Sequence, residues 1–171
     1  MRLSRLAGGA VVVVLVGALS AAPAQAATVE QVCVGTEVTT FDPPLTFTPR
    51  ETTIAVSGVF PSCANAGAVT GTYAETFSLT ASCLTLFDSG AAQRTFTWGG
   101  TLAPSEFQYN AVSNAAGAAV VTTNTGVVTS GGFAPAGAVQ VVSLVTPNAL
   151  QCLTAGVASM AGPTTLTIQR S

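Results

Sequence analysis

The sequence contains no histidine, and only five of its 171 residues are basic. Without an imidazole, Ser–His and Cys–His nucleophilic arrangements are excluded. None of the basic residues is a lysine, and two of the five arginines stand at positions 2 and 5. The other three, Arg50, Arg94 and Arg170, are too few to supply the phosphate contacts on which nucleic-acid affinity depends, or a polybasic patch for a membrane surface. Both classes of partner are therefore excluded.

The first 26 residues have the pattern of a cleavable secretion signal. Arg2 and Arg5 precede an apolar run from Leu6 to Leu19, and the small residues around Gln25 form a cleavage site. A membrane anchor is the alternative, but this run is shorter than the ~20 residues that span a bilayer. We expect a secreted, soluble mature chain of residues 27–171, with no membrane association after cleavage.

Acidic residues are also few. All seven lie after position 26, and the same part of the chain contains three arginines, so the predicted mature chain has a side-chain charge of −4. Removal of the first 26 of the 171 residues leaves 145, the size of one ordinary domain. No repeat of fixed period and no long linker divides these residues, and we expect a single domain.

The stretch from Val69 to Thr101 carries the clearest structural pattern. Apolar side chains alternate with threonine and serine from Tyr73 to Cys83, which is the period of a half-buried strand. After Asp88, Ser89 and Gly90 the chain returns through residues that share a second alternating face, namely Arg94, Phe96 and Trp98. The pattern predicts a hairpin with its aromatic face, including Trp98, in a core.

The rest of the mature chain follows the same pattern of short β-branched runs separated by Gly and Pro. Pro43 and Pro44 are expected to end the first run, and residues 151–160 are expected to form a late strand. Residues 111–120 are rich in alanine and could form a helical turn, but Gly117 favours a loop. Roughly eight to ten strands at intervals of about 8 to 12 residues predict an all-β fold, with a sandwich as the expected architecture.

Four cysteines, an even number, follow the predicted secretion signal: Cys33, Cys63, Cys83 and Cys152. In an oxidising compartment they should form two disulfides, for which three pairings are possible. No C-x-x-C spacing and no histidine support a zinc site. We expect no metal site and no cofactor.

The order Cys83, Trp98, Cys152 resembles the cysteine–tryptophan–cysteine unit of immunoglobulin-like sandwiches. That resemblance implies an antiparallel immunoglobulin-like β-sandwich with Cys83 paired to Cys152, and hence Cys33 to Cys63. The chain departs from the antibody pattern, because Leu150 stands where a tyrosine is expected.

The segments TEVTTFDPPLT, RTFTWGG, TGVVTSGGF and VTPNALQC together resemble an uncharacterised family of small secreted actinobacterial proteins of the Streptomyces type. The similarity covers most of the predicted mature chain, although Gly99 replaces the asparagine that usually follows the tryptophan. The resemblance implies a compartment and a fold, and it implies no catalytic residues.

Three acidic residues are candidates for paired-carboxylate chemistry: Glu75, Asp88 and Glu106. Glu75 shares an alternating face with Tyr73 and Phe77. The structural interpretation is that Glu75 lies near the exposed start of its strand, or pairs across the hairpin with Arg94, which is at about the right distance from the turn, and that Asp88 only forms a turn. The structural interpretation is favoured, and we assign no catalytic residue.

The sequence thus predicts a secreted, noncatalytic binding or surface-interaction module, whose partner is an extracellular protein or a polysaccharide. One alternative is an extracellular protease inhibitor that presents the loop at residues 61–67, which contains Cys63. A less favoured alternative is a carbohydrate-active protein that uses Glu75, Asp88 and Glu106.

Overall fold

The computed structural model describes residues 26–85 and 89–170. The predicted secretion signal, apart from Ala26, lies outside the described residues, as does Asp88. The elements are β1 (Thr28–Leu45), β2 (Arg50–Cys63), β3 (Ala68–Ala81), β4 (Gly90–Gly100), β5 (Ser105–Ala116), β6 (Ala119–Ser130), β7 (Ala136–Val145), α1 (Ala149–Leu153) and β8 (Val157–Arg170). Each strand is antiparallel to the next, and the all-β prediction is confirmed.

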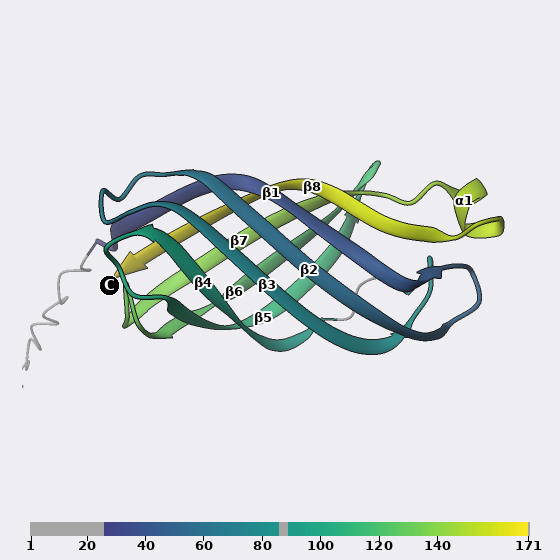
Figure 1. The fold of residues 1–171 in the computed structure, drawn as a ribbon, viewed down its shortest axis with the longest axis horizontal. Coiled ribbons are helices and arrows are strands. Elements are labelled where there is room, and N and C mark those ends of the chain that lie inside the picture. Colours follow the sequence, from purple (N-terminus) through teal and green to yellow (C-terminus); the bar gives the residue numbers. More distant parts are fainter. Residues whose placement is uncertain (1–25, 86–88, 171) are drawn as a thin grey trace, which may run out of the picture.

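The sheet closes into an eight-stranded barrel, because β8 pairs with β1 as well as with β7 (Figure 1). The β1–β8 ladder runs from Thr28 opposite Arg170 to Leu45 opposite Val157. The prediction of an immunoglobulin-like sandwich is therefore wrong. Barrels and sandwiches both bury alternate residues of each strand, so alternation along one strand does not distinguish them.

Three local predictions also need correction. β1 continues through Pro43 and Pro44 to Leu45, where a break was expected. Residues 111–120, expected to contain a loop, form the end of β5, a tight turn and the start of β6. Cys152 lies in the short helix α1 rather than in a strand; Asn148 caps this helix by accepting a hydrogen bond from the Leu150 amide.

The two ends of the barrel differ in how they are filled. The end at the left in Figure 1 is filled by seven aromatic side chains: Phe60, Tyr73, Phe96, Trp98, Phe107, Tyr109 and Phe133. The centroids of neighbouring rings lie 5.0 to 6.1 Å apart. Trp98 is 6% exposed, and its indole N–H donates to Ser105 Oγ at 2.8 Å. The prediction that Trp98 belongs to the core is confirmed. We call this the closed end; α1 projects beyond the opposite, open end.

Both predicted disulfides are present, Cys33–Cys63 and Cys83–Cys152. The first joins residues that face each other across β1 and β2. The second joins the segment after β3 to α1 at the open end. Trp98, at the closed end, therefore does not pack as the immunoglobulin pattern implied, although that pattern led to the correct pairing.

The barrel wall is incomplete between β3 and β4. Their ladder runs only from Ala68 opposite Gly100 to Thr72 opposite Thr97. Among the described residues, those from Tyr73 to Ala81 and from Gly90 to Phe96 form no pairs with each other. The predicted hairpin thus exists at the closed end, and its strands separate toward the turn. We call this opening the seam.

Within the described ranges, 26–85 and 89–170, no helix has the length and apolar character needed to cross a membrane.

Candidate functional site

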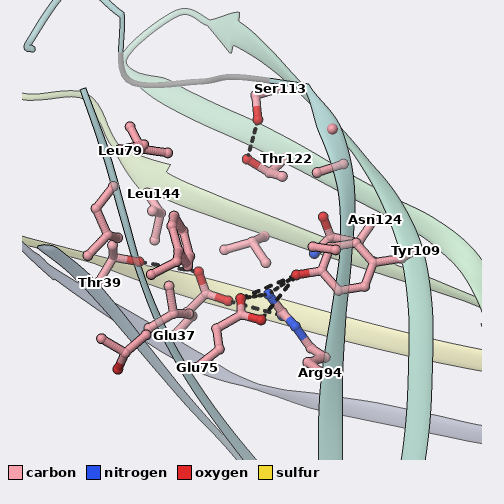
Figure 2. Close-up of a pocket in the computed structure, with 18 of the residues that line it drawn as sticks. Glu37, Thr39, Glu75, Leu79, Arg94, Tyr109, Ser113, Thr122, Asn124 and Leu144 are labelled. Atoms are coloured by element: carbon pink, nitrogen blue, oxygen red, sulfur yellow. Dashed lines mark hydrogen bonds and ion pairs between the residues drawn. The ribbon is translucent and has the colours of Figure 1, made fainter. Parts of the chain in front are cut away.

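A cavity of about 510 Å³ occupies the open half of the barrel (Figure 2). Its volume lies within the range of sites that enclose small molecules. Most of its wall is apolar, and the side chains that make up this wall come from seven strands: Phe41, Ile54, Val56, Phe77, Leu79, Ala92, Ala111, Val142, Leu144 and Met160. At the inner end of the cavity, toward the aromatic core, lies a group of charged and polar side chains. We call this group the floor; it consists of Glu37, Tyr73, Glu75, Arg94, Tyr109 and Gln140.

The cavity opens to solvent through the seam. Thr76 and Gln93, on either side of the seam, both line it. Phe77, on the same alternating face as Tyr73, is 43% exposed. Side chains that would be enclosed in a continuous barrel therefore contact solvent here, and the seam provides a lateral way into the interior.

Arg94 is the centre of the floor. It reaches into the barrel from β4 and is 6% exposed. Its Nη1 donates to Gln140 Oε1 at 2.6 Å, and its Nη2 donates to Tyr109 Oη at 2.9 Å and to Glu75 Oε1. Glu37 Oε2 lies 3.7 Å from Nη1. Burial opposes the guanidinium charge, but the carboxylate of Glu75 and the other neighbouring groups outweigh it, and the pKa of Arg94 is raised.

Glu37 is the more buried of the two floor carboxylates. Its side chain is 7% exposed, against 14% for Glu75. Tyr73 Oη donates to Glu37 Oε2 at 2.6 Å, and Thr39 Oγ1 lies 3.4 Å from Oε1. Burial raises the pKa of Glu37 more than the hydrogen bond from Tyr73 and the charge of Arg94 lower it.

The two tyrosines of the floor stay protonated at physiological pH. Burial and the nearby carboxylate of Glu37 raise the pKa of Tyr73. Burial raises the pKa of Tyr109 to about 12, although Arg94 lowers it in part. Both hydroxyls therefore act as donors to the carboxylates, Tyr73 to Glu37 and Tyr109 to Glu75. The floor is a hydrogen-bonded layer that holds its charged groups in fixed positions.

Two buried polar atoms of this region have no hydrogen-bond partner among the described residues: Arg94 Nε and Asn124 Oδ1. Asn124, on β6, is 2% exposed and lines the cavity next to Tyr109 (Figure 2). Buried polar atoms are nearly always paired in proteins. Asn124 is therefore an uncommitted polar group beside the cavity.

Two of the three candidate acids from the sequence, Glu75 and Glu106, lie within the described residues, on opposite faces of the barrel wall. Glu75 lies on the floor, and its predicted pairing with Arg94 is confirmed. The alternative, that Glu75 is at an exposed strand start, is wrong. Glu106 lies on the outer face of β5, where it accepts hydrogen bonds from Gln93 and Thr95. Asp88 lies outside the described residues.

The loop considered for protease inhibition is held at the closed end. Its first residues, through Cys63, belong to β2. Asn65 holds the loop to β1: its backbone N–H donates to Gln31 Oε1 at 2.9 Å, and its Nδ2 donates to Glu30 O at 3.2 Å. The inhibitor function stays a prediction.

Sequence reasoning missed Glu37, Tyr109 and Gln140 as floor residues. Glu37 alternates with Thr39 and Phe41 in the same strand, which places it on the inner face. The alternation predicts that Glu37 lies on the inner face of its strand, but it does not predict which side chains lie beside it. Glu37 comes close to Arg94 only because the sheet closes into a barrel.

Comparison of the chain with models of known protein families, with curated protein sequences and with solved structures found no match. The resemblance to small secreted actinobacterial proteins therefore stays a prediction. No group of three or more His, Cys, Asp or Glu side chains in the described part of the chain could hold a metal ion.

Proposed function

We propose that this protein is a secreted, noncatalytic binding protein that holds one small, mostly apolar molecule inside the barrel. The observation that carries the proposal is the cavity of about 510 Å³, which has apolar walls, a fixed polar floor and an opening at the seam. Such a site buries the apolar body of a ligand while a few polar groups set its orientation. An enclosed space of this size suits a small molecule better than a polysaccharide chain.

Secretion is supported by two features of the chain. The first residues have the pattern of a cleavable signal, and both disulfides require an oxidising compartment to form and persist. Outside the cell, a binding protein of this kind would sequester or carry a poorly water-soluble compound.

The test is the uptake of an uncharged fluorescent probe, N-phenyl-1-naphthylamine, by the purified oxidised protein. We expect saturable binding of one probe molecule per chain. Ala111→Phe, which places a ring in the cavity, should weaken binding by at least about tenfold. Val112→Phe is the matched control, because Val112 is the next residue of β5, is 50% exposed and lies outside the cavity lining. Absence of saturable binding, or equal binding by Ala111→Phe and the control, would overturn the proposal.

A further inference from the structure

The floor of the cavity contains more negative than positive groups. Its ionisable side chains are Glu37 from β1, Tyr73 and Glu75 from β3, Arg94 from β4 and Tyr109 from β5. The other four strands contribute no titratable side chain to the cavity lining among the described residues. With both carboxylates ionised and both tyrosines neutral, two negative charges face one positive charge. A buried excess charge is unfavourable unless something balances it.

The surroundings of Arg94 disfavour an anionic ligand, because its two terminal nitrogens are engaged and the donor left without a partner, Nε–H, is buried. Nη1 is bonded to Gln140, and Nη2 is bonded to Tyr109 and Glu75. An added carboxylate or phosphate would meet the two carboxylates beside the guanidinium, and to accept more than the single buried Nε–H it would have to displace these partners.

The floor favours a cationic ligand, because it offers hydrogen-bond acceptors and an excess of negative charge. Glu75, which has the less buried of the two carboxylates, lines the cavity. Asn124 also lines the cavity, and its Oδ1 accepts no hydrogen bond from any described residue. In Figure 2 both carboxylates lie beside the Arg94 guanidinium, and Asn124 lies next to Tyr109. A primary ammonium group carries three N–H donors and one positive charge, which matches these acceptors and the excess charge.

We infer that the ligand is an amphiphilic amine, whose protonated nitrogen lies on the floor near Glu37, Glu75 and Asn124 and whose apolar part fills the cavity toward the open end. This inference rests on the proposed function and specifies its ligand. When the cavity is empty, protonation of Glu37, whose pKa burial raises, removes the excess charge. A bound ammonium group takes the place of that proton, so amine binding should strengthen as pH rises through the pKa of Glu37.

The experiment compares three probes of one shape: 4-phenylbutylamine, 4-phenylbutan-1-ol and 4-phenylbutanoate, titrated by calorimetry at about pH 7.5. We expect the amine to bind at least about tenfold more tightly than the alcohol, and the carboxylate to bind most weakly. Glu37→Gln, which removes the excess charge, should reduce the preference for the amine to about twofold or less. Glu106→Gln is the matched control, since it makes the same charge change on the outer face and should keep the preference.

The outcomes separate the two proposals. If the alcohol binds as tightly as the amine in the wild-type protein, the inference of an amine ligand is overturned, while the binding function stands. If Glu37→Gln keeps the full preference, the charge balance assigned to the floor is wrong, whatever the wild-type result. If neither these probes nor N-phenyl-1-naphthylamine binds, the proposed function itself fails. The wild-type comparison decides the amine inference even if the Glu37 variant does not fold.

Discussion

Replacement of Arg94 by methionine should be among the most destabilising single changes in the barrel. Methionine retains an apolar side chain between the rings of Tyr73 and Tyr109, whose centroids lie 4.6 and 4.9 Å from the guanidinium carbon. It removes the charge that faces Glu37 and Glu75. The variant therefore tests the electrostatics of the floor with little change in packing.

The expected loss follows from what Arg94 leaves behind. Gln140 and Tyr109 each lose a hydrogen bond from a charged donor, and the two floor carboxylates, one buried and one partly buried, lose their cation. Removal of one partner from a buried ion pair costs about 3 to 5 kcal/mol of unfolding free energy. Since domains are stable by only about 5 to 15 kcal/mol, this is a large fraction of the total.

Urea unfolding followed by the fluorescence of Trp98, the one tryptophan and a buried one, measures the change. The loss should shrink at about pH 4, because protonation of Glu37, whose pKa burial raises, removes part of the unbalanced charge. Arg94→Met combined with Glu37→Gln and Glu75→Gln should recover most of the stability at about pH 7. Arg170→Met is the control, since Arg170 is half exposed in its ion pair with Glu30 and should cost less than about 1 kcal/mol. A loss in Arg94→Met as small as that of the control, or independent of pH, would refute the reasoning.

Three further changes test the fold and the floor. Trp98→Ala should lower the unfolding free energy by about 3 to 5 kcal/mol, measured by circular dichroism in urea, and a loss below about 1 kcal/mol would mean that the ring is not part of the core. Replacement of Cys83 and Cys152 by serine opens a loop with a sequence separation of 69 residues and should lower the unfolding free energy by about 4 kcal/mol by the chain-entropy relation. An unchanged urea midpoint would contradict this expectation. Glu37 has a folded pKa above its unfolded value, so its favourable contribution is complete below about pH 4 and is lost as pH rises through the folded pKa. The melting temperature of Glu37→Gln should therefore rise relative to wild type between about pH 4 and pH 8, and a constant difference would contradict the assigned burial.

The alternation of side chains was enough to predict strands and their inner faces. Trp98, Phe96 and Arg94 share the inner face of β4, as their spacing indicated. The side chain of Glu75 reaches Arg94 from β3, although the two strands do not pair at these positions. These relations are local, because they depend on one strand or on one hairpin. The pairing of Glu75 with Arg94 could be predicted for this reason.

Closure of the barrel could not be predicted in the same way. It depends on the pairing of β1 with β8, which places Thr28 opposite Arg170, and no local pattern specifies that contact. Glu37 comes from β1 and reaches Arg94 only within the closed sheet. The sequence therefore predicts that Glu37 points into the barrel, but it does not predict that Glu37 lies beside Arg94. The disulfide pairing was predicted correctly from the wrong architecture, so its success does not support the sandwich.

The position of the cavity follows from the sizes of inward-facing side chains along two adjacent strands. An eight-stranded barrel has an interior that large side chains can just fill. In both β4 and β5 the inward-facing side chains are large at the closed end and small at the open end. From the closed end they are Trp98, Phe96, Arg94, Ala92 and Gly90 in β4, and Phe107, Tyr109, Ala111 and Ser113 in the antiparallel β5. The same small residues of β4 border the seam, where β4 has no ladder with β3. Filling the open half with larger side chains should therefore abolish ligand binding without disturbing the aromatic core, and this is why Ala111→Phe is the variant that decides the proposed function.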